Sequence, residues 1–232
     1  MRAAMAPSLG DTATGRNDLP EEIVDATFAI SCRCLPVDHA FALYEAVRGA
    51  LPWFADEPLA GLHVVYGAAS GSGWMRPEGD GALLQLSNRA KLALRLPRRR
   101  LQDASLLVGR TLEVAGWPLE VRDVSVRPLA RITTLFSRCV VLASGEDEPA
   151  FLAAAAAELA ALRIQPKTML CGRSTPLATP ARILQTRSLM LAGLSLAHSL
   201  DVQRRGLGGE RKYGCGVFIP HKDIGDLNPG PE

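Results

Sequence analysis

Residues 206–218 read GLGGERKYGCGVF, two Gly-x-Gly pairs that flank a short polar and basic insert. Glycine adopts positive φ at little cost and allows another backbone to come close. The insert carries Arg211, Lys212 and Tyr213, and backbone N–H groups in such a loop suit anions. The stretch predicts a basic loop that lies against phosphate groups, followed by a last strand from Cys215 to Ile219.

This stretch has two other interpretations. Gly206 can end a helix, because glycine is common just past a helix C-terminus, and the other glycines can serve a hairpin. This alternative stays open. A dinucleotide-binding fingerprint fits poorly, because its third glycine would fall at Arg211 and that motif should open a helix.

The composition predicts a globular protein without a membrane span. The chain has 232 residues, is 47% hydrophobic and has a formal net charge of +2, so affinity for nucleic acid must come from a local basic patch. No apolar run is long enough to cross a membrane, and the first residues lack a signal peptide. We expect a cytoplasmic protein that does not bind membranes.

The cysteines predict reduced structural thiols and no metal site. Their number is odd, no secretion signal is present, and a zinc site needs about four ligands. The five are Cys32, Cys34, Cys139, Cys171 and Cys215. No cofactor is expected. Aromatic residues make up 5% of the chain, so base stacking on a sheet is a poor guess for how RNA would be read.

The order of predicted elements is β-α-β-β-α-β, and it occurs twice. The first set comprises strands at 27–35, 62–66, 83–86, 91–96 and 112–126, a helix from Asp38 to Leu51 and a basic helix at 98–107. The second comprises strands at 131–143, 182–191 and 215–219 and helices at 148–162 and 195–205. This order predicts an α+β fold of two tandem ferredoxin-like (RRM-like) units with a C-terminal glycine-rich loop.

The predicted division places an N-terminal tail at 1–24 and a C-terminal tail at 223–232. Between them lie an N-terminal ferredoxin-like domain at 25–127 and a C-terminal one at 128–222, which carries the glycine-rich loop. Residues 67–81, rich in Gly, Ser and Pro, are expected to form a loop.

Three stretches carry a resemblance to a known family: LPVDHA at 35–40, LALRLP at 92–97 and the segment from GLGG at 206–209 to GCGVFIP at 214–220. The glycine-rich loop resembles that of the CRISPR-associated RAMP superfamily. Together the stretches resemble the sixth Cas family, the repeat-processing endoribonucleases, in its short MYXAN-type branch. The resemblance spans roughly residues 25–220.

The resemblance implies an enzyme that binds the CRISPR repeat in precursor RNA and cuts it once per repeat to give mature guide RNA. It implies attack by the ribose 2′-OH on the adjacent phosphorus, a 2′,3′-cyclic phosphate product and no required metal. The expected partner is repeat RNA, as precursor and as mature guide, and other Cas effector subunits are a further class of partner.

The resemblance also implies that His39, at the start of the first helix, is the catalytic histidine. Histidine suits proton transfer near neutral pH, and the edge of the apolar helix face should let this ring reach the surface. The alternative is a residue that merely packs or caps the helix. His63, His198 and His221 are weaker candidates.

Basic residues and loop glycines are the predicted RNA contacts. They are Arg98, Arg99, Arg100, Arg187, Arg204, Arg205, Gly206, Gly208, Arg211, Lys212, Gly214 and Gly216. The ordinary alternative for a charge run is a solvated face, and Arg204 and Arg205 also suit the C-terminus of a helix.

Two other function classes remain as alternatives. One is a non-catalytic RAMP subunit that binds guide RNA in an effector complex, which has no need of His39. The other is an unrelated small-molecule α+β enzyme, for which we find no nucleotide motif or metal cluster.

Overall fold

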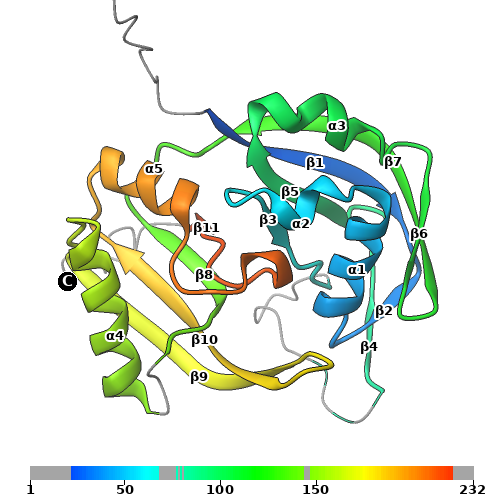
Figure 1. The fold of residues 1–232 in the computed structure, drawn as a ribbon. Helices are drawn as coiled ribbons and strands as arrows, with labels where there is room; N and C mark the ends of the chain where they lie inside the picture. The colour runs from blue at the N-terminus through cyan, green and yellow to red at the C-terminus, as the bar shows by residue number, and fades with distance from the viewer. Residues whose placement is uncertain (1–21, 68–76, 78, 80, 144–146, 222–232) are drawn as a thin grey trace, which may run out of the picture.

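Two antiparallel sheets lie side by side in the computed structural model, which describes residues 22–67, 77, 79, 81–143 and 147–221 (Figure 1). The first sheet has the order β3-β5-β1-β7-β6. Its strands are β1 (Ile23–Ser31), β3 (Gly61–His63), β5 (Lys91–Pro97), β6 (Thr111–Val114) and β7 (Trp117–Pro128). Antiparallel β5 separates β1 from β3, which is the split β-α-β arrangement that the element order predicts.

The helices of the first unit are α1 (Ala40–Ala50), α2 (Trp53–Asp56) and α3 (Leu101–Ser105), with the short helix η1 (Arg98–Arg100) before α3. Leu43 and Val47 are four residues apart on α1, so both face the sheet and are fully buried. They join alternate residues of β1, among them Val24, Ala26 and Phe28, in one apolar core.

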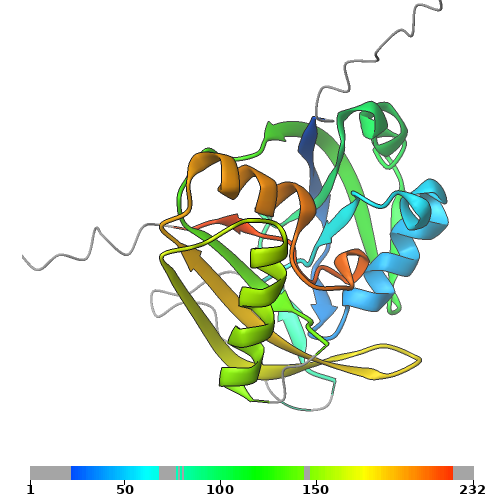
Figure 2. The same ribbon diagram turned by 60° about the vertical axis from the view of Figure 1, so that its left-hand side comes forward.

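The second sheet repeats the pattern with the order β11-β8-β10-β9. Its strands are β8 (Leu135–Val140), β9 (Thr168–Ala178), β10 (Ile183–Ala192) and β11 (Ile219–Pro220). Helices α4 (Glu148–Ala161) and α5 (Leu196–Arg205) cover one face of it (Figure 2). Phe151, Ala155 and Leu159 recur every four residues on α4 and are buried against this sheet. The first three strands of each sheet along the chain have the same spatial order, β3-β5-β1 in the first sheet and β9-β10-β8 in the second. The predicted α+β, ferredoxin-like fold class is confirmed.

Several element bounds differ from the predicted ones. The first predicted strand divides, because β2 (Cys34–Pro36) leaves the large sheet and pairs with β4 (Leu83–Gln85). Strand β9 was not predicted, since most of its residues are exposed and give little apolar alternation. The last strand begins later than predicted, at Ile219, because Gly216 inside the predicted range has positive φ and cannot belong to a strand. Most of the loop predicted at 67–81 lies outside the described residues.

One buried arginine links the two units. Arg95 on β5 is fully buried and forms two hydrogen bonds, of 2.8 and 2.9 Å, to the carboxylate of Asp25 on β1. Its third nitrogen donates to the carbonyls of Gln203 and Phe218 in the second unit, at 3.1 and 2.7 Å. These contacts to a cation hold the pKa of Asp25 well below its usual range despite burial. Within the described residues, no helix is long and apolar enough to cross a membrane.

Candidate active site

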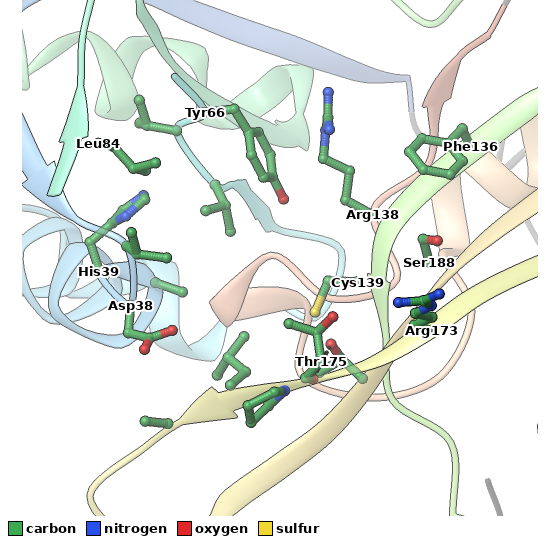
Figure 3. Close-up of a pocket in the computed structure, with 18 residues that line it drawn as sticks. Asp38, His39, Tyr66, Leu84, Phe136, Arg138, Cys139, Arg173, Thr175 and Ser188 are labelled. Atoms are coloured by element: carbon green, nitrogen blue, oxygen red, sulfur yellow. Dashed lines mark hydrogen bonds between the residues drawn. The ribbon is translucent and has the colours of Figure 1, made fainter. Parts of the chain in front are cut away.

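A cavity of about 300 Å³ lies where the start of α1 faces the second sheet (Figure 3). The first unit lines it with Val37, Asp38, His39, Ala40, Val64, Val65, Tyr66 and Leu84. The second unit lines it with Phe136, Arg138, Cys139, Arg173, Thr175, Pro176, Leu177, Ala178, Thr186 and Ser188. A volume of this order lies at the small end of ligand pockets, so it suits one nucleotide rather than a duplex.

His39 immediately precedes α1 and is fully buried in the wall of this cavity. Its Nδ1 lies 2.7 Å from the carbonyl oxygen of Pro36, so the ring turns back to β2 instead of capping the helix. A carbonyl only accepts, so Nδ1 carries the proton, and in a neutral ring Nε2 is then the acceptor. The expectation that His39 reaches the outer surface is wrong, because the Pro36 contact holds the ring inside the cavity wall.

Two exposed arginines of the second sheet complete the cavity's charged groups. Arg138 on β8 places its guanidinium carbon 4.3 Å from the ring centroid of Tyr66, within cation–π range. Arg173 lies on β9, which β10 separates from β8 in the sheet. With His39 and Asp38, these groups give the cavity an excess of positive charge, which suits a phosphate.

The sequence analysis did not identify Arg138 or Tyr66 as site residues. One signal could have found Arg138: it alternates with buried Leu135, Ser137 and Cys139 along β8, so it points to the opposite face from them. A single arginine at such a position, in an otherwise uncharged strand, indicates that this face of the sheet contacts solvent or a polar ligand.

The predicted arginine cluster on η1 is balanced by carboxylates of the same unit. Buried Glu57 accepts from Arg99 at 2.8 Å and from Arg100 at 3.4 Å. Arg98 forms an ion pair with Glu22, with nitrogen–oxygen distances of 2.6 and 2.8 Å. These ion pairs give the arginine cluster a structural role. Its role in RNA binding remains a prediction.

The glycine-rich loop meets the protein's own atoms closely. Gly206 has φ of +76° and ends α5, as the helix-end interpretation predicts. A Cβ on Gly208 would lie 2.1 Å from the carbonyl oxygen of Val141, and one on Gly216 would lie 2.1 Å from that of Leu207. The predictions of positive φ and of close backbone approach are therefore confirmed for these glycines. The backbone that comes close in this structure is the protein's own.

The cations of the loop turn toward the first unit. Arg211 is partly buried and donates to the carbonyl of Leu59 at 3.4 Å, and Lys212 donates to the carbonyl of Glu57. Burial lowers the pKa of Arg211 to about 10 and that of Lys212 to about 8. Their assignment to RNA stays a prediction, and in this structure they join the two units.

Tyr213 extends the same contact. Its ring centroid lies 5.6 Å from that of Phe41 and 5.2 Å from that of Tyr44, both on α1. Burial raises the pKa of its hydroxyl. The insert of the loop therefore packs on α1 through an aromatic cluster.

The other predicted RNA-binding arginines lie apart from the cavity. Arg187 donates to the carbonyl of Gly172 at 3.0 Å and lines a second hollow of about 420 Å³, between β10 and residues 141–143. Arg204 contacts Asp201 at 3.3 Å, and Arg205 is exposed at the end of α5. Within the described part of the chain, none of the twelve predicted RNA contacts lines the cavity around His39.

The three other histidines differ from His39 in their surroundings. His63 lies 3.3 Å from the carboxylate of Asp25, and burial lowers its pKa. His198 lies in the first turns of α5, and His221 follows β11 with its ring against Phe136. Of the histidines in the described ranges, His39 is the one in the cavity wall.

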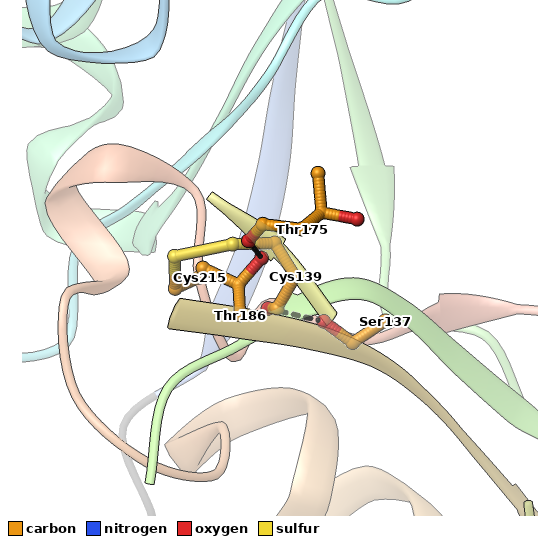
Figure 4. Close-up of a disulfide and its surroundings, with 5 residues drawn as sticks. All are labelled: Ser137, Cys139, Thr175, Thr186 and Cys215. Carbon is orange, nitrogen blue, oxygen red and sulfur yellow. Dashed lines mark hydrogen bonds between the residues drawn. A yellow bond between two sulfur atoms is a disulfide. The ribbon is translucent and has the colours of Figure 1, made fainter. Parts of the chain in front are cut away.

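Cys139 and Cys215 form a disulfide that joins β8 to the glycine-rich loop, with Cα atoms 4.7 Å apart (Figure 4). The expectation of reduced thiols throughout is wrong for this pair, because a backbone hydrogen bond of 2.7 Å from Gly216 to Cys139 brings the two segments together. Cys32, Cys34 and Cys171 are free. The described residues contain no group of three or more His, Cys, Asp and Glu side chains placed to hold a metal.

Comparison with known proteins agrees with the resemblance seen in the sequence. Residues 24–223 match the family described as Cas6 CRISPR. A CRISPR-associated endonuclease Cas6 from Myxococcus xanthus (strain DK1622) is 34% identical over 197 residues, 85% of this chain and 81% of that protein.

Solved structures show the same fold at low sequence identity. A CRISPR-associated protein Cas6 has a TM-score of 0.59 and 10% identity, covering 87% of this chain and 100% of that one. A RAMP protein that binds different RNA substrates has a TM-score of 0.56 and 13% identity, covering 85% and 98%. The sequence matches over most of the chain establish that this protein belongs to the Cas6 family.

Proposed function

We propose that this protein is an endoribonuclease that binds the repeat of precursor CRISPR RNA and cleaves it to give mature guide RNA. Its 34% identity to a Cas6 endonuclease over most of both chains supports the activity. The observation that carries the site is the cavity between the units, which gathers His39, Arg138 and Arg173. RNA is the partner, and other Cas effector subunits remain a further proposed class of partner.

The proposed chemistry needs no atom beyond RNA and protein. The ribose 2′-OH loses its proton and attacks the adjacent phosphorus, the bond to the 5′ oxygen breaks, and that oxygen takes up a proton. The products are a 2′,3′-cyclic phosphate and a 5′-OH. Since the nucleophile belongs to the substrate, proton transfer and charge stabilisation are what the protein supplies, and we propose that no metal is required.

His39 is the proposed proton-transfer group. Its Nδ1–H is held by the Pro36 carbonyl, which leaves Nε2 of the neutral ring as the proton acceptor. Such general acid–base help contributes on the order of 10²–10⁴-fold in rate. Arg138 and Arg173 supply the positive charge that steadies the developing charge on the phosphate oxygens.

The division into domains at 25–127 and 128–222 also stays a proposal, supported by two separate apolar cores, one formed by residues 24–121 and one by residues 135–218. We propose a cytoplasmic location, because the expected substrate is an RNA transcript.

Two substitutions at His39 test the proposed function. His39→Asn keeps a donor near the position of Nδ1 and so preserves the Pro36 contact, while it removes Nε2. His39→Ala removes both. In EDTA, both variants should cleave repeat RNA at least about 100-fold more slowly than the wild type and bind it with little change.

A His39→Asn variant that cleaves at the wild-type rate would show that His39 only packs against β2. If the wild type binds repeat RNA and cleaves none, the protein is a non-catalytic RNA-binding subunit. Activity that disappears in EDTA and returns with magnesium would contradict the metal-independent mechanism.

A further inference from the structure

A row of flat side chains leads out of the cavity. The guanidinium of Arg138 lies over the ring of Tyr66 at 4.3 Å and over that of Phe136 at 6.0 Å (Figure 3). The ring of Phe136 lies 5.6 Å from that of His221, tilted by 56°. We call Tyr66, Arg138, Phe136 and His221 the stacking row.

The backbone fixes the direction of this row. Phe136 and Arg138 are two residues apart on β8, so their side chains share the face that meets the cavity. His221 follows β11, which pairs with β8, and the backbone N–H of His221 donates to the carbonyl of Thr134 at 3.1 Å. Tyr66, Arg138 and Phe136 line the cavity and His221 is exposed, so the row runs from the cavity to the surface.

The chemistry of the row fits unpaired nucleobases. Bases that are not paired stack on aromatic rings and on the plane of an arginine, and every base has a face to offer. Paired bases are stacked on each other, and a cavity of about 300 Å³ is too small for a duplex. The positive charge of Arg138 also attracts the phosphates that connect the bases.

We propose that the stacking row binds the unpaired nucleobases next to the scissile phosphate, and so positions that phosphate beside His39. This inference rests on the proposed function. A base inserted beside Phe136 or His221 extends the row, and the RNA backbone then follows it into the cavity. The ligand class is single-stranded RNA on one side of the cut.

Fluorescence of 2-aminopurine tests this site, because the fluorescence of this base is quenched when it stacks. Repeat RNAs carry a 2′-deoxy sugar at the cut, which removes the nucleophile, and 2-aminopurine at one position at a time. Wild-type protein should quench one to three consecutive positions that adjoin the cut. Phe136→Leu removes a ring but keeps an apolar side chain, and His221→Leu replaces the imidazole ring with an aliphatic side chain. Each should reduce this quenching and weaken binding by about 10-fold.

Trp117→Leu is the matched control, since it removes a ring from β7, outside the cavity lining. It should leave quenching and binding unchanged. If wild-type protein cleaves repeat RNA, yet Phe136→Leu and His221→Leu bind and quench like the wild type, the row only packs the two units together and this inference is wrong. If wild-type protein fails to bind repeat RNA at all, the proposed function itself has failed.

Discussion

The glycine-rich loop and the cavity both lie between the two units, and they place their cations in opposite ways. In the loop, Arg211 and Lys212 turn inward and donate to main-chain carbonyls of the first unit. In the cavity, Arg138 and Arg173 are exposed on the second sheet. A basic residue between the units can therefore either join the two units or remain available to a ligand. The less exposed cations do the first, and the exposed ones can do the second.

The loop's glycines should give the largest effect on stability. Gly216→Ala places a Cβ at positive φ and 2.1 Å from a carbonyl oxygen, so the free energy of unfolding should fall by at least about 2 kcal/mol. Gly209→Ala is the control in the same loop, because within the described structure its Cβ would meet no atom within 4 Å. It should change stability by less than about 0.5 kcal/mol.

Urea unfolding of both variants measures this difference. Equal stabilities would mean that the loop is looser than its contacts indicate, and the contrast with the cavity would be lost. Normal stability of Gly216→Ala with strongly weakened RNA binding would instead favour a direct RNA contact by the glycine-rich loop.

The cations should give the next largest effect, and the two regions should differ in how RNA binding responds. Lys212→Met removes the hydrogen bond to the Glu57 carbonyl together with a charge that burial disfavours, so stability at pH 7 should change by less than about 1 kcal/mol and RNA affinity by less than about 2-fold. Arg173→Met should leave stability nearly unchanged and weaken RNA binding about 5- to 10-fold.

Binding measured at several salt concentrations sharpens this pair. Arg173→Met should reduce the slope of log affinity against log salt by about one unit, as the loss of a phosphate contact does. Lys212→Met should keep the wild-type slope. The reverse pattern would support the sequence-based assignment of Lys212 to RNA.

The smallest effect is a pH dependence at Lys212. Burial lowers its pKa in the folded protein to about 8, below the value in the unfolded chain, so above pH 8 the unfolded state binds more protons. This residue's contribution to stability should therefore increase as pH rises from about 8 to 9.5. The difference in unfolding free energy between wild type and Lys212→Met, measured across that window, isolates it from other titrating groups. A constant difference would show that Lys212 is solvated rather than buried.

The order of elements was predictable because their signals are local. The α4 helix begins at the Asp147 cap, which accepts from the Ala150 N–H at 2.8 Å, and has its apolar residues four apart. The glycines of the loop predicted positive φ correctly, because the φ angle that a residue can adopt depends on the residue type. The fold class and the family followed from these elements and from short matching stretches.

The cavity was less predictable because its contacts join distant parts of the chain. Tyr66 belongs to the first unit and Arg138 to the second, and the sequence around either residue gives no sign of the contact between them. The carboxylates that balance the η1 arginines are similarly remote, as Glu57 shows. The low aromatic content of the whole chain made base stacking a poor guess. The fold nevertheless brings a few rings together at one place, as at Phe136 and His221.

Arg95 has one further consequence, for how the two halves can diverge. Its acceptors across the joint are the carbonyls of Gln203 and Phe218, and every amino acid supplies a carbonyl. The loop's Arg211 and Lys212 likewise bind the main chain of the first unit. The acceptor side of these contacts depends on where the backbone runs and not on which side chains it carries, whereas the donor side requires Arg95, Arg211 and Lys212 themselves. Substitutions at Gln203, Phe218, Leu59 or Glu57 that keep the backbone in place should therefore leave these hydrogen bonds intact.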